Sequence, residues 1–243
     1  MKIRFGLLAM VLGALGFRVA VNAAGTSLTP LQDNTIYSEA DYSNAKGPLF
    51  VGTTPNVTTR RALMEFDIAG SIPSGATITS VSLTLTQTKI GPGASTSFDL
   101  RKLNASWGEG TSSGSGGGAL ATTNDATWNY RFYNSTSWST PGADFGAVSA
   151  SVALAGNGQY TVNSTPALVA DVQGWLNSPS SNNGWIFRAA DESFTSAREI
   201  GSRETATPPQ LTVTYSVPEP TTGIIFGAVA FIAGRRRSRR CAA

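Results

Sequence analysis

The chain of 243 residues contains no histidine, and its one cysteine is Cys241. The first 240 residues therefore have no disulfide, no Cys/His zinc site and no Ser-His or Cys-His nucleophile. Only carboxylates, tyrosine, lysine and arginine are left for acid-base chemistry. These absences favour a protein without catalytic activity.

Positive charge is scarce in the middle of the chain. Residues 25–217 hold ten lysines and arginines against fourteen acidic residues, a net charge of −4, although the whole chain carries +3. The excess of positive charge therefore comes from the two ends. Because binding to phosphates needs clustered lysine and arginine, we expect no nucleic-acid partner.

The N-terminus has the layout of a secretory signal peptide. Lys2 and Arg4 precede an apolar segment over residues 5–17, and small residues follow as far as Ala23 and Ala24. This order is typical of a signal peptide that is cleaved near its small residues. We therefore predict a signal peptide over residues 1–24 and exclude it from the fold.

The C-terminus carries a second apolar segment, the 14 uncharged residues 221–234, which five arginines follow within residues 235–240. An arginine at the bilayer centre costs about 2.5–3.5 kcal/mol, so the cluster is expected to stay in the cytoplasm and residues before Val217 to lie outside. The segment is shorter than the ~20 residues that cross a bilayer comfortably, so local thinning of the bilayer and snorkelling arginines would have to help. An ordinary tail anchor is the alternative.

This tail resembles a known signal. The residues that carry the resemblance, on either side of the apolar run, are Val217, Pro218, Glu219, Pro220, Arg235, Arg236 and Arg237. In this order they resemble the PEP-CTERM sorting signal of exopolysaccharide-producing Gram-negative bacteria. The resemblance implies that an exosortase, a membrane protease and transpeptidase, processes residues 217–243. It also implies a secreted protein of the cell surface, outer envelope or extracellular matrix, which contacts the membrane through the tail before processing.

The residues between the two ends have the pattern of short β-strands. In residues 60–68, Ala62, Met64, Phe66 and Ile68 alternate with polar residues, and only Leu63 breaks the pattern. This period of two is typical of a strand with one buried face. Further strands are expected over residues 34–37, 48–52, 76–90, 98–103, 147–154, 159–162, 185–188 and 210–215.

One helix and one long loop interrupt the strands. Thr165 followed by Pro166 is a typical helix start, and the apolar residues up to Leu176 fall on one face. Residues 107–118 are rich in glycine and serine, so we expect a surface loop without a packed core. The pattern predicts an all-β fold, a jelly-roll-like β-sandwich with one short helix over residues 25–216.

Several short motifs in this region resemble a known module. In order they are Asp-x-Thr-Ile-Tyr at 33–37, Phe-Asp-Ile at 66–68 before Ile-Pro-Ser-Gly-Ala, Trp-x-Glu-Gly at 107–110, Ala-Thr-Trp-Asn at 126–129, Val-Gln-Gly-Trp at 172–175 and Ser-Arg-Glu at 202–204. Together they are similar to the DNRLRE-type domain, which is related to carbohydrate-binding module family 96. The resemblance implies a β-sandwich appended to polysaccharide-active or surface proteins.

Two sets of residues are candidates for a site. The first set is Trp107, Trp128, Tyr130 and Trp138, the last three of which lie within eleven residues, and their rings could stack on the C–H faces of sugars. The alternative, which we favour slightly, is that the tryptophans cap the end of the sandwich. Arg203 and Glu204 form the second set.

Arg203 and Glu204 are adjacent and would face opposite sides of a strand, so we expect each to pair with another residue. The candidate partners are Arg198, Glu199, Glu65 and Asp67. A structural ion-pair network is favoured over a ligand site at this position.

Some acidic residues could bind calcium, because Ca²⁺ takes clustered carboxylates from loops as ligands. The candidates are Asp33, Glu39, Asp41, Asp144, Asp171, Asp191 and Glu192. None has the spacing of an EF-hand, so we expect a scattered, solvated set, no metal and no cofactor.

The sequence thus predicts a non-catalytic exported protein that binds or scaffolds polysaccharide. A small carboxylate-dependent polysaccharide hydrolase or lyase and a purely structural surface protein are the alternatives.

Overall fold

A computed structural model describes residues 21–39, 41–91 and 96–218. The chain divides into two units, Ala23–Val217 and a second one formed by residues 1–22 and 218–243. Almost all described residues belong to the unit Ala23–Val217.

β-strands dominate the described part of the chain. They are β1 (Val21–Leu28), β2 (Gln32–Tyr37), β3 (Tyr42–Ser43), β4 (Leu49–Thr53), β5 (Thr59–Glu65), β6 (Thr77–Ile90), β7 (Thr96–Leu103), β8 (Ala119–Leu120), β9 (Tyr130–Phe132), β10 (Thr136–Ser137), β11 (Phe145–Leu154), β12 (Gly158–Val162), β13 (Trp185–Ala189), β14 (Arg198–Ile200) and β15 (Gln210–Pro218). The helices are α1 (Ile68–Ser71), α2 (Pro166–Asn177) and the short 3₁₀ helix η1 (Pro179–Ser181). The mostly β character predicted from the alternating pattern is confirmed.

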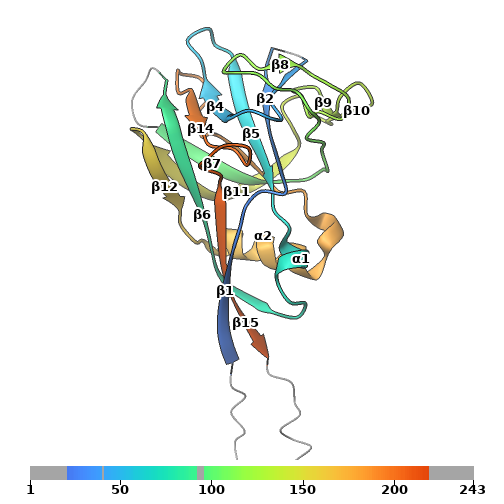
Figure 1. Ribbon diagram of the computed structural model, residues 1–243, viewed down its shortest axis with the longest axis vertical. Helices are drawn as coiled ribbons and strands as arrows, with labels where there is room; N and C mark the ends of the chain where they lie inside the picture. The colour runs from blue at the N-terminus through green and yellow to red at the C-terminus, as the bar shows by residue number, and fades with distance from the viewer. Residues whose placement is uncertain (1–20, 40, 92–95, 219–243) are drawn as a thin grey trace, which may run out of the picture. The chain divides into compact units, whose positions relative to one another are not determined.

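The strands form a two-layer sandwich (Figure 1). One layer has the order β1-β15-β6-β14-β4, and the long strand β6 also pairs with β12. The other layer has the order β2-β5-β13-β7-β11, with β3 beside β2 and β8 beside β3. The strand β4 pairs with β14 through its first half and with β5 through its second half, so it links the two layers.

The link depends on Gly52, where β4 passes from one layer to the other. Its φ is +92°, and a Cβ atom there would lie 2.5 Å from the carbonyl oxygen of Ser196. Only glycine combines this left-handed backbone with so close an approach. The strand can therefore change partners without a break.

The main core lies between the two layers. It includes Ala62 and Met64 of β5 and residues of β4, β6, β7, β11, β12, β13, β14, β15, α1 and α2. A second core lies on the outer face of the β2-β5-β13 layer, where Leu63 and Ile186 pack with Trp107 and Trp138 from the loops. Leu63 is therefore no irregularity of the pattern, because both faces of β5 are covered.

The structure corrects the end of the predicted strand 60–68. β5 ends at Glu65, and Ile68 begins the helix α1. The Asp67 side chain caps this helix by accepting a hydrogen bond from the Gly70 amide at 2.9 Å, and Ile68 still packs in the main core. The prediction of one short helix was wrong, because α1 is a second one.

The helix α2 begins as predicted. Thr165 is its N-cap and accepts a hydrogen bond from the Leu168 amide at 3.1 Å, and Pro166 is its first residue. The buried residues Leu168, Val172 and Trp175 place its apolar face on the core. It packs against β6 and β11 and covers one end of the sandwich (Figure 1).

The prediction that residues 107–118 lack a packed core was wrong in part. Trp107 and Ser112 are buried there, with exposed fractions of 3% and 2%. The glycines on either side of Glu109 let the loop lie tightly on its neighbours, because a Cβ atom on Gly108 would be 2.0 Å from the Asn124 carbonyl oxygen. Trp107, at the start of this loop, is therefore part of the second core.

The predicted terminal signals fall mostly outside the described residues. Val217 and Pro218 end β15, whereas Glu219, Pro220, Arg235, Arg236 and Arg237 lie beyond the described part. β1 begins at Val21 and runs through the predicted cleavage positions Ala23 and Ala24. Among the residues that the structure describes, none of the helices has the length and apolar character needed to cross a bilayer.

Candidate functional site

Two of the four aromatic candidates are buried. Trp107 and Trp138 are 3% and 5% exposed. Their indole N–H groups donate hydrogen bonds to the carbonyl oxygens of Asn183 and Thr127, each at 2.9 Å. A buried ring cannot offer its face to a sugar, so these two tryptophans are corrected from sugar-binding to core residues.

The other two candidates remain partly exposed. The Arg61 guanidinium lies 4.5 Å from the centre of the Trp128 ring, a cation–π contact that occupies one face. Tyr130 begins the hairpin β9–β10 and makes an edge-to-face contact with Tyr133, with ring centres 5.8 Å apart. Phe132 lies between them in the sequence and is also partly exposed. Residues 128–133 therefore carry four partly exposed rings, of which Trp128 also packs against the second core. We call this segment the aromatic hairpin.

Arg203 and Glu204 do not lie in a strand. They occupy a turn between β14 and β15, in which the Thr205 amide donates to the Ser202 carbonyl oxygen at 3.0 Å. A turn does not keep neighbouring side chains on opposite faces, and the Arg203 Nε lies 2.9 Å from the Glu204 Oε1. The prediction that these two residues cannot pair was therefore wrong.

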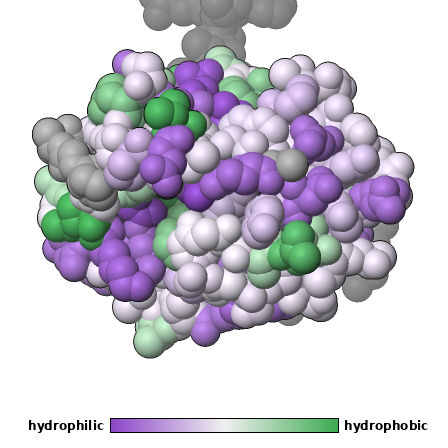
Figure 2. Space-filling model, turned by 90° about the horizontal axis from the view of Figure 1, so that it is seen from above, coloured by the Kyte–Doolittle hydropathy of each residue, from purple (hydrophilic) through white to green (hydrophobic). Residues whose placement is uncertain are grey.

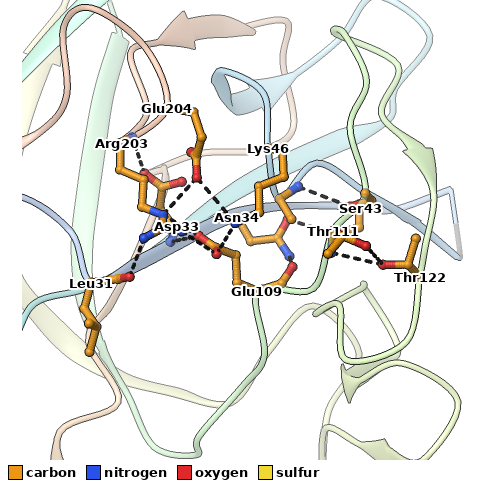
Figure 3. A network of polar contacts seen from close by, with 12 residues as sticks. Leu31, Asp33, Asn34, Ser43, Lys46, Glu109, Thr111, Thr122, Arg203 and Glu204 are labelled. Atoms are coloured by element: carbon orange, nitrogen blue, oxygen red, sulfur yellow. Dashed lines mark hydrogen bonds and ion pairs between the residues drawn. The ribbon is translucent and has the colours of Figure 1, made fainter.

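The partners of this pair also differ from those expected. Arg203 donates to both carboxylate oxygens of Glu109 at 2.8 Å, and its own backbone amide donates to the Asp33 Oδ2 at 2.8 Å. The Lys46 ammonium forms ion pairs with Glu109 and, at 3.5 Å, with Glu204. We call Asp33, Lys46, Glu109, Arg203 and Glu204 the carboxylate cluster (Figure 3).

The strand β2 and the loop after Trp107 hold this cluster together. The Asp33 amide donates to the Glu109 Oε1 at 3.0 Å, and the Asn34 side chain donates to the Glu109 carbonyl oxygen at 3.1 Å. Gly110 has φ of +69°, and a Cβ atom there would lie 2.0 Å from the Asp125 Oδ1. Glu109 is thus fixed in place by a backbone that only glycine permits beside it.

Burial dominates the electrostatics of Asp33. The residue is 0% exposed, and its Oδ1 atom has no hydrogen-bond partner. Burial, with the carboxylates of Glu204 and Glu109 as weaker contributions, raises the pKa of Asp33 to about 8, against a lowering effect of the Arg203 amide. At neutral pH the Asp33 carboxyl is therefore mainly protonated.

The charges of the cluster then balance. With a proton on Asp33, the carboxylates of Glu109 and Glu204 face the two cations Lys46 and Arg203. Burial acts to lower the pKa of Arg203, but the carboxylates of Glu109 and Glu204 outweigh this effect and raise it. Arg203 stays charged, and the cluster is neutral only while Asp33 keeps its proton.

The other predicted acidic candidates lie apart from this cluster in separate contacts. Glu39 pairs with Arg60 at 2.6 Å, and Glu192 pairs with Arg61 at 2.7 Å. The Asp171 Oδ2 accepts from Ser149 at 2.6 Å and from the Trp185 indole at 2.9 Å. Asp144 and Asp191 accept hydrogen bonds from nearby backbone amides.

An open pocket of about 260 Å³ lies on the β6-β14-β4 layer. Phe50, Glu199 and Lys89 are neighbours across these three strands and line it. The Lys89 ammonium pairs with Glu199 at 2.7 Å. Seen from above, the surface is mostly hydrophilic, and its hydrophobic residues are scattered rather than joined into one patch (Figure 2).

A scan of protein-family models and a search of curated proteins found no match for this chain. The two resemblances drawn from the motifs therefore stay predictions. The motifs Asp33–Tyr37, Trp107–Gly110 and Ser202–Glu204 each supply a carboxylate to one cluster. Sequence reasoning named Asp33 and Glu204 separately, but it missed Lys46 and the role of Glu109, because no spacing links residues so far apart.

Proposed function

We propose that this protein is an exported, non-catalytic surface or matrix protein that binds polysaccharide through the aromatic hairpin. The observation that carries the proposal is the group of partly exposed rings at Trp128, Tyr130, Phe132 and Tyr133. Rings of this kind stack on the C–H faces of sugars. The face seen from above is mostly hydrophilic, which fits a polar, extended ligand better than an apolar partner (Figure 2).

The proposal also covers the type of sandwich and the signal in the tail. We propose a jelly-roll arrangement of the DNRLRE type for the sandwich and a PEP-CTERM signal for the tail. The first supports a carbohydrate ligand, and the second supports export and processing by an exosortase. Placement in the extracellular matrix would bring the aromatic hairpin to exopolysaccharide.

The test is affinity electrophoresis of the purified full-length protein in gels that contain a neutral or an anionic polysaccharide. We expect retarded migration of the wild type in at least one gel, and loss of most of that retardation in Tyr130→Ala. The matched control is Tyr42→Ala, because Tyr42 is an exposed tyrosine of β3 outside the hairpin.

The outcomes separate the three candidate functions. Retardation that depends on Tyr130, without release of reducing ends, supports the proposal. Release of reducing ends would point to the carboxylate-dependent hydrolase or lyase. Unretarded migration in every gel would favour a purely structural surface protein.

A further inference from the structure

The carboxylate cluster holds three acidic groups close enough to share one ion. One oxygen each from Asp33, Glu109 and Glu204 lies within 4.8 Å of the other two. Oxygens bound to one Ca²⁺ at 2.3–2.6 Å are at most about 5 Å apart, whereas those on one Mg²⁺ are at most about 4.2 Å apart. The upper limit of 4.8 Å lies within the reach of one Ca²⁺ ion, which accepts carboxylates in a flexible geometry, whereas Mg²⁺ demands a near-ideal octahedron.

The second observation is that the Asp33 carboxyl group is buried and has an oxygen without a partner. Its side chain is 0% exposed, and its Oδ1 atom lacks a hydrogen-bond donor although it lies among charged groups. A buried oxygen without a partner is costly, and a proton or a cation would satisfy it. Figure 3 shows this carboxyl beside Arg203, Glu204 and Glu109.

The position of Lys46 indicates where the cation would bind. Its ammonium group contacts Glu109 and Glu204, two of the three carboxylates in question. Its side chain is 31% exposed, so the ammonium group can move into solvent on its flexible stem. Lys46 thus occupies the place of a small cation at the mouth of the cluster.

We propose that Asp33, Glu109 and Glu204 form a Ca²⁺ site, and that Ca²⁺ replaces Lys46. Without the ion, Lys46 and Arg203 face the carboxylates of Glu109 and Glu204. With it, the Lys46 ammonium group lies in solvent, and Ca²⁺ with Arg203 faces the three carboxylates.

This exchange gives Lys46 a role that an ion-pair network does not predict. Removing its charge leaves all three carboxylates and removes the competitor, so Lys46→Met binds Ca²⁺ more tightly than the wild type. Asp33→Asn removes a ligand charge and binds more weakly.

The experiment is isothermal titration calorimetry of the full-length protein, stripped with EDTA, with CaCl₂ and separately with MgCl₂. We expect a Ca²⁺ dissociation constant of about 10⁻⁴–10⁻³ M at pH 8, as in extracellular modules. Loss of a ligand in Asp33→Asn weakens it about tenfold or more. Lys46→Met tightens it by at least about threefold, and Mg²⁺ binds more weakly than Ca²⁺.

Lys89→Met is the matched control, since Lys89 pairs with Glu199 away from the cluster, and it leaves the affinity unchanged. Two results overturn the proposal: no Ca²⁺ binding by the wild type up to about 10 mM, far above the range expected for such sites, or equal affinity in Asp33→Asn. A Lys46→Met affinity no higher than that of the wild type overturns the exchange with Lys46. The lysine variant keeps the test decisive even if Asp33→Asn does not fold.

Discussion

Asp33 is a carboxyl group that the fold holds in its neutral form. Its usual pKa of 3.8 is raised to about 8, mainly by burial. A folded state with a raised pKa binds its proton more tightly than the unfolded state, so the stabilisation is complete below pH 3.8 and is lost as the pH rises through 8. In EDTA, Asp33 therefore makes the free energy of unfolding fall between about pH 4 and 8.

The change Asp33→Asn tests this pH dependence. One proton accounts for at most about 1.4 kcal/mol per pH unit, and that share of the slope disappears in the variant. Glu65 and Asp125 also have raised pKa values through burial, so part of the slope remains. Urea unfolding at several pH values measures the difference, and equal slopes for both proteins would contradict the assignment.

Single residues also show where sequence reasoning stops. Leu63 was expected on a solvent-facing side, but loops from residues 105–145 cover that side and bury it. Trp107 and Trp138 belong to those loops, and aromatic residues in loops look alike in a sequence whether they cover a sheet or face a ligand. Which of the two they do depends on contacts with distant residues such as Asn183.

Among the helices and turns, replacing each of two glycines by alanine is expected to change the free energy of unfolding in opposite directions. Gly174 lies exposed inside α2, and a Cβ atom there would meet no atom within 4 Å. Gly174→Ala should raise the free energy of unfolding by about 0.5–1 kcal/mol, because alanine favours the helix. A urea-unfolding midpoint that falls would contradict this account of α2.

Gly184 stands in the turn before β13 with φ of +71°, and a Cβ atom would lie 2.0 Å from the Met64 carbonyl oxygen. Gly184→Ala should lower the free energy of unfolding by about 1–3 kcal/mol through backbone strain and a clash with β5. The same urea titration measures it. A variant as stable as the wild type would show that the turn adapts.

Elements with a local signal could be predicted, and elements without one could not. Alternation located most of the longer strands but missed β1 and β14, and Thr165 with Pro166 located the start of α2, because neighbouring residues determine both signals. α1 was missed because it is four residues long and depends on a single cap at Asp67. The turn at Arg203 was mistaken for a strand, because the residues that hold it, Asp33 and Glu109, lie far away in the sequence.

For the whole molecule, we propose that the protein is exported, that its tail is processed and that it binds polysaccharide. The chain lacks histidine, and the described unit Ala23–Val217 is a sandwich with aromatic rings partly exposed on one hairpin. The predicted tail follows the sandwich in the chain, so a cut after Pro218, the last residue of β15, would leave the described strands whole. Substituting Glu219 by Gln should therefore reduce processing and leave full-length protein in the membrane fraction.

Immunoblots of the cell fractions measure this effect, because they show the length of the protein and the fraction in which it lies. The control is Glu199→Gln, an acidic residue of β14 in the sandwich. Equal processing of the wild type and Glu219→Gln would contradict the role given to the Val217–Pro220 motif.

The most direct test of the whole account is the fraction of the processed protein that copurifies with the polysaccharide of the producing cells. The account predicts that the wild type is found there in shortened form, and that a Trp128→Ala/Tyr130→Ala variant is shortened equally but released into the medium. Full-length wild-type protein in the cytosol, free of polysaccharide, would contradict it.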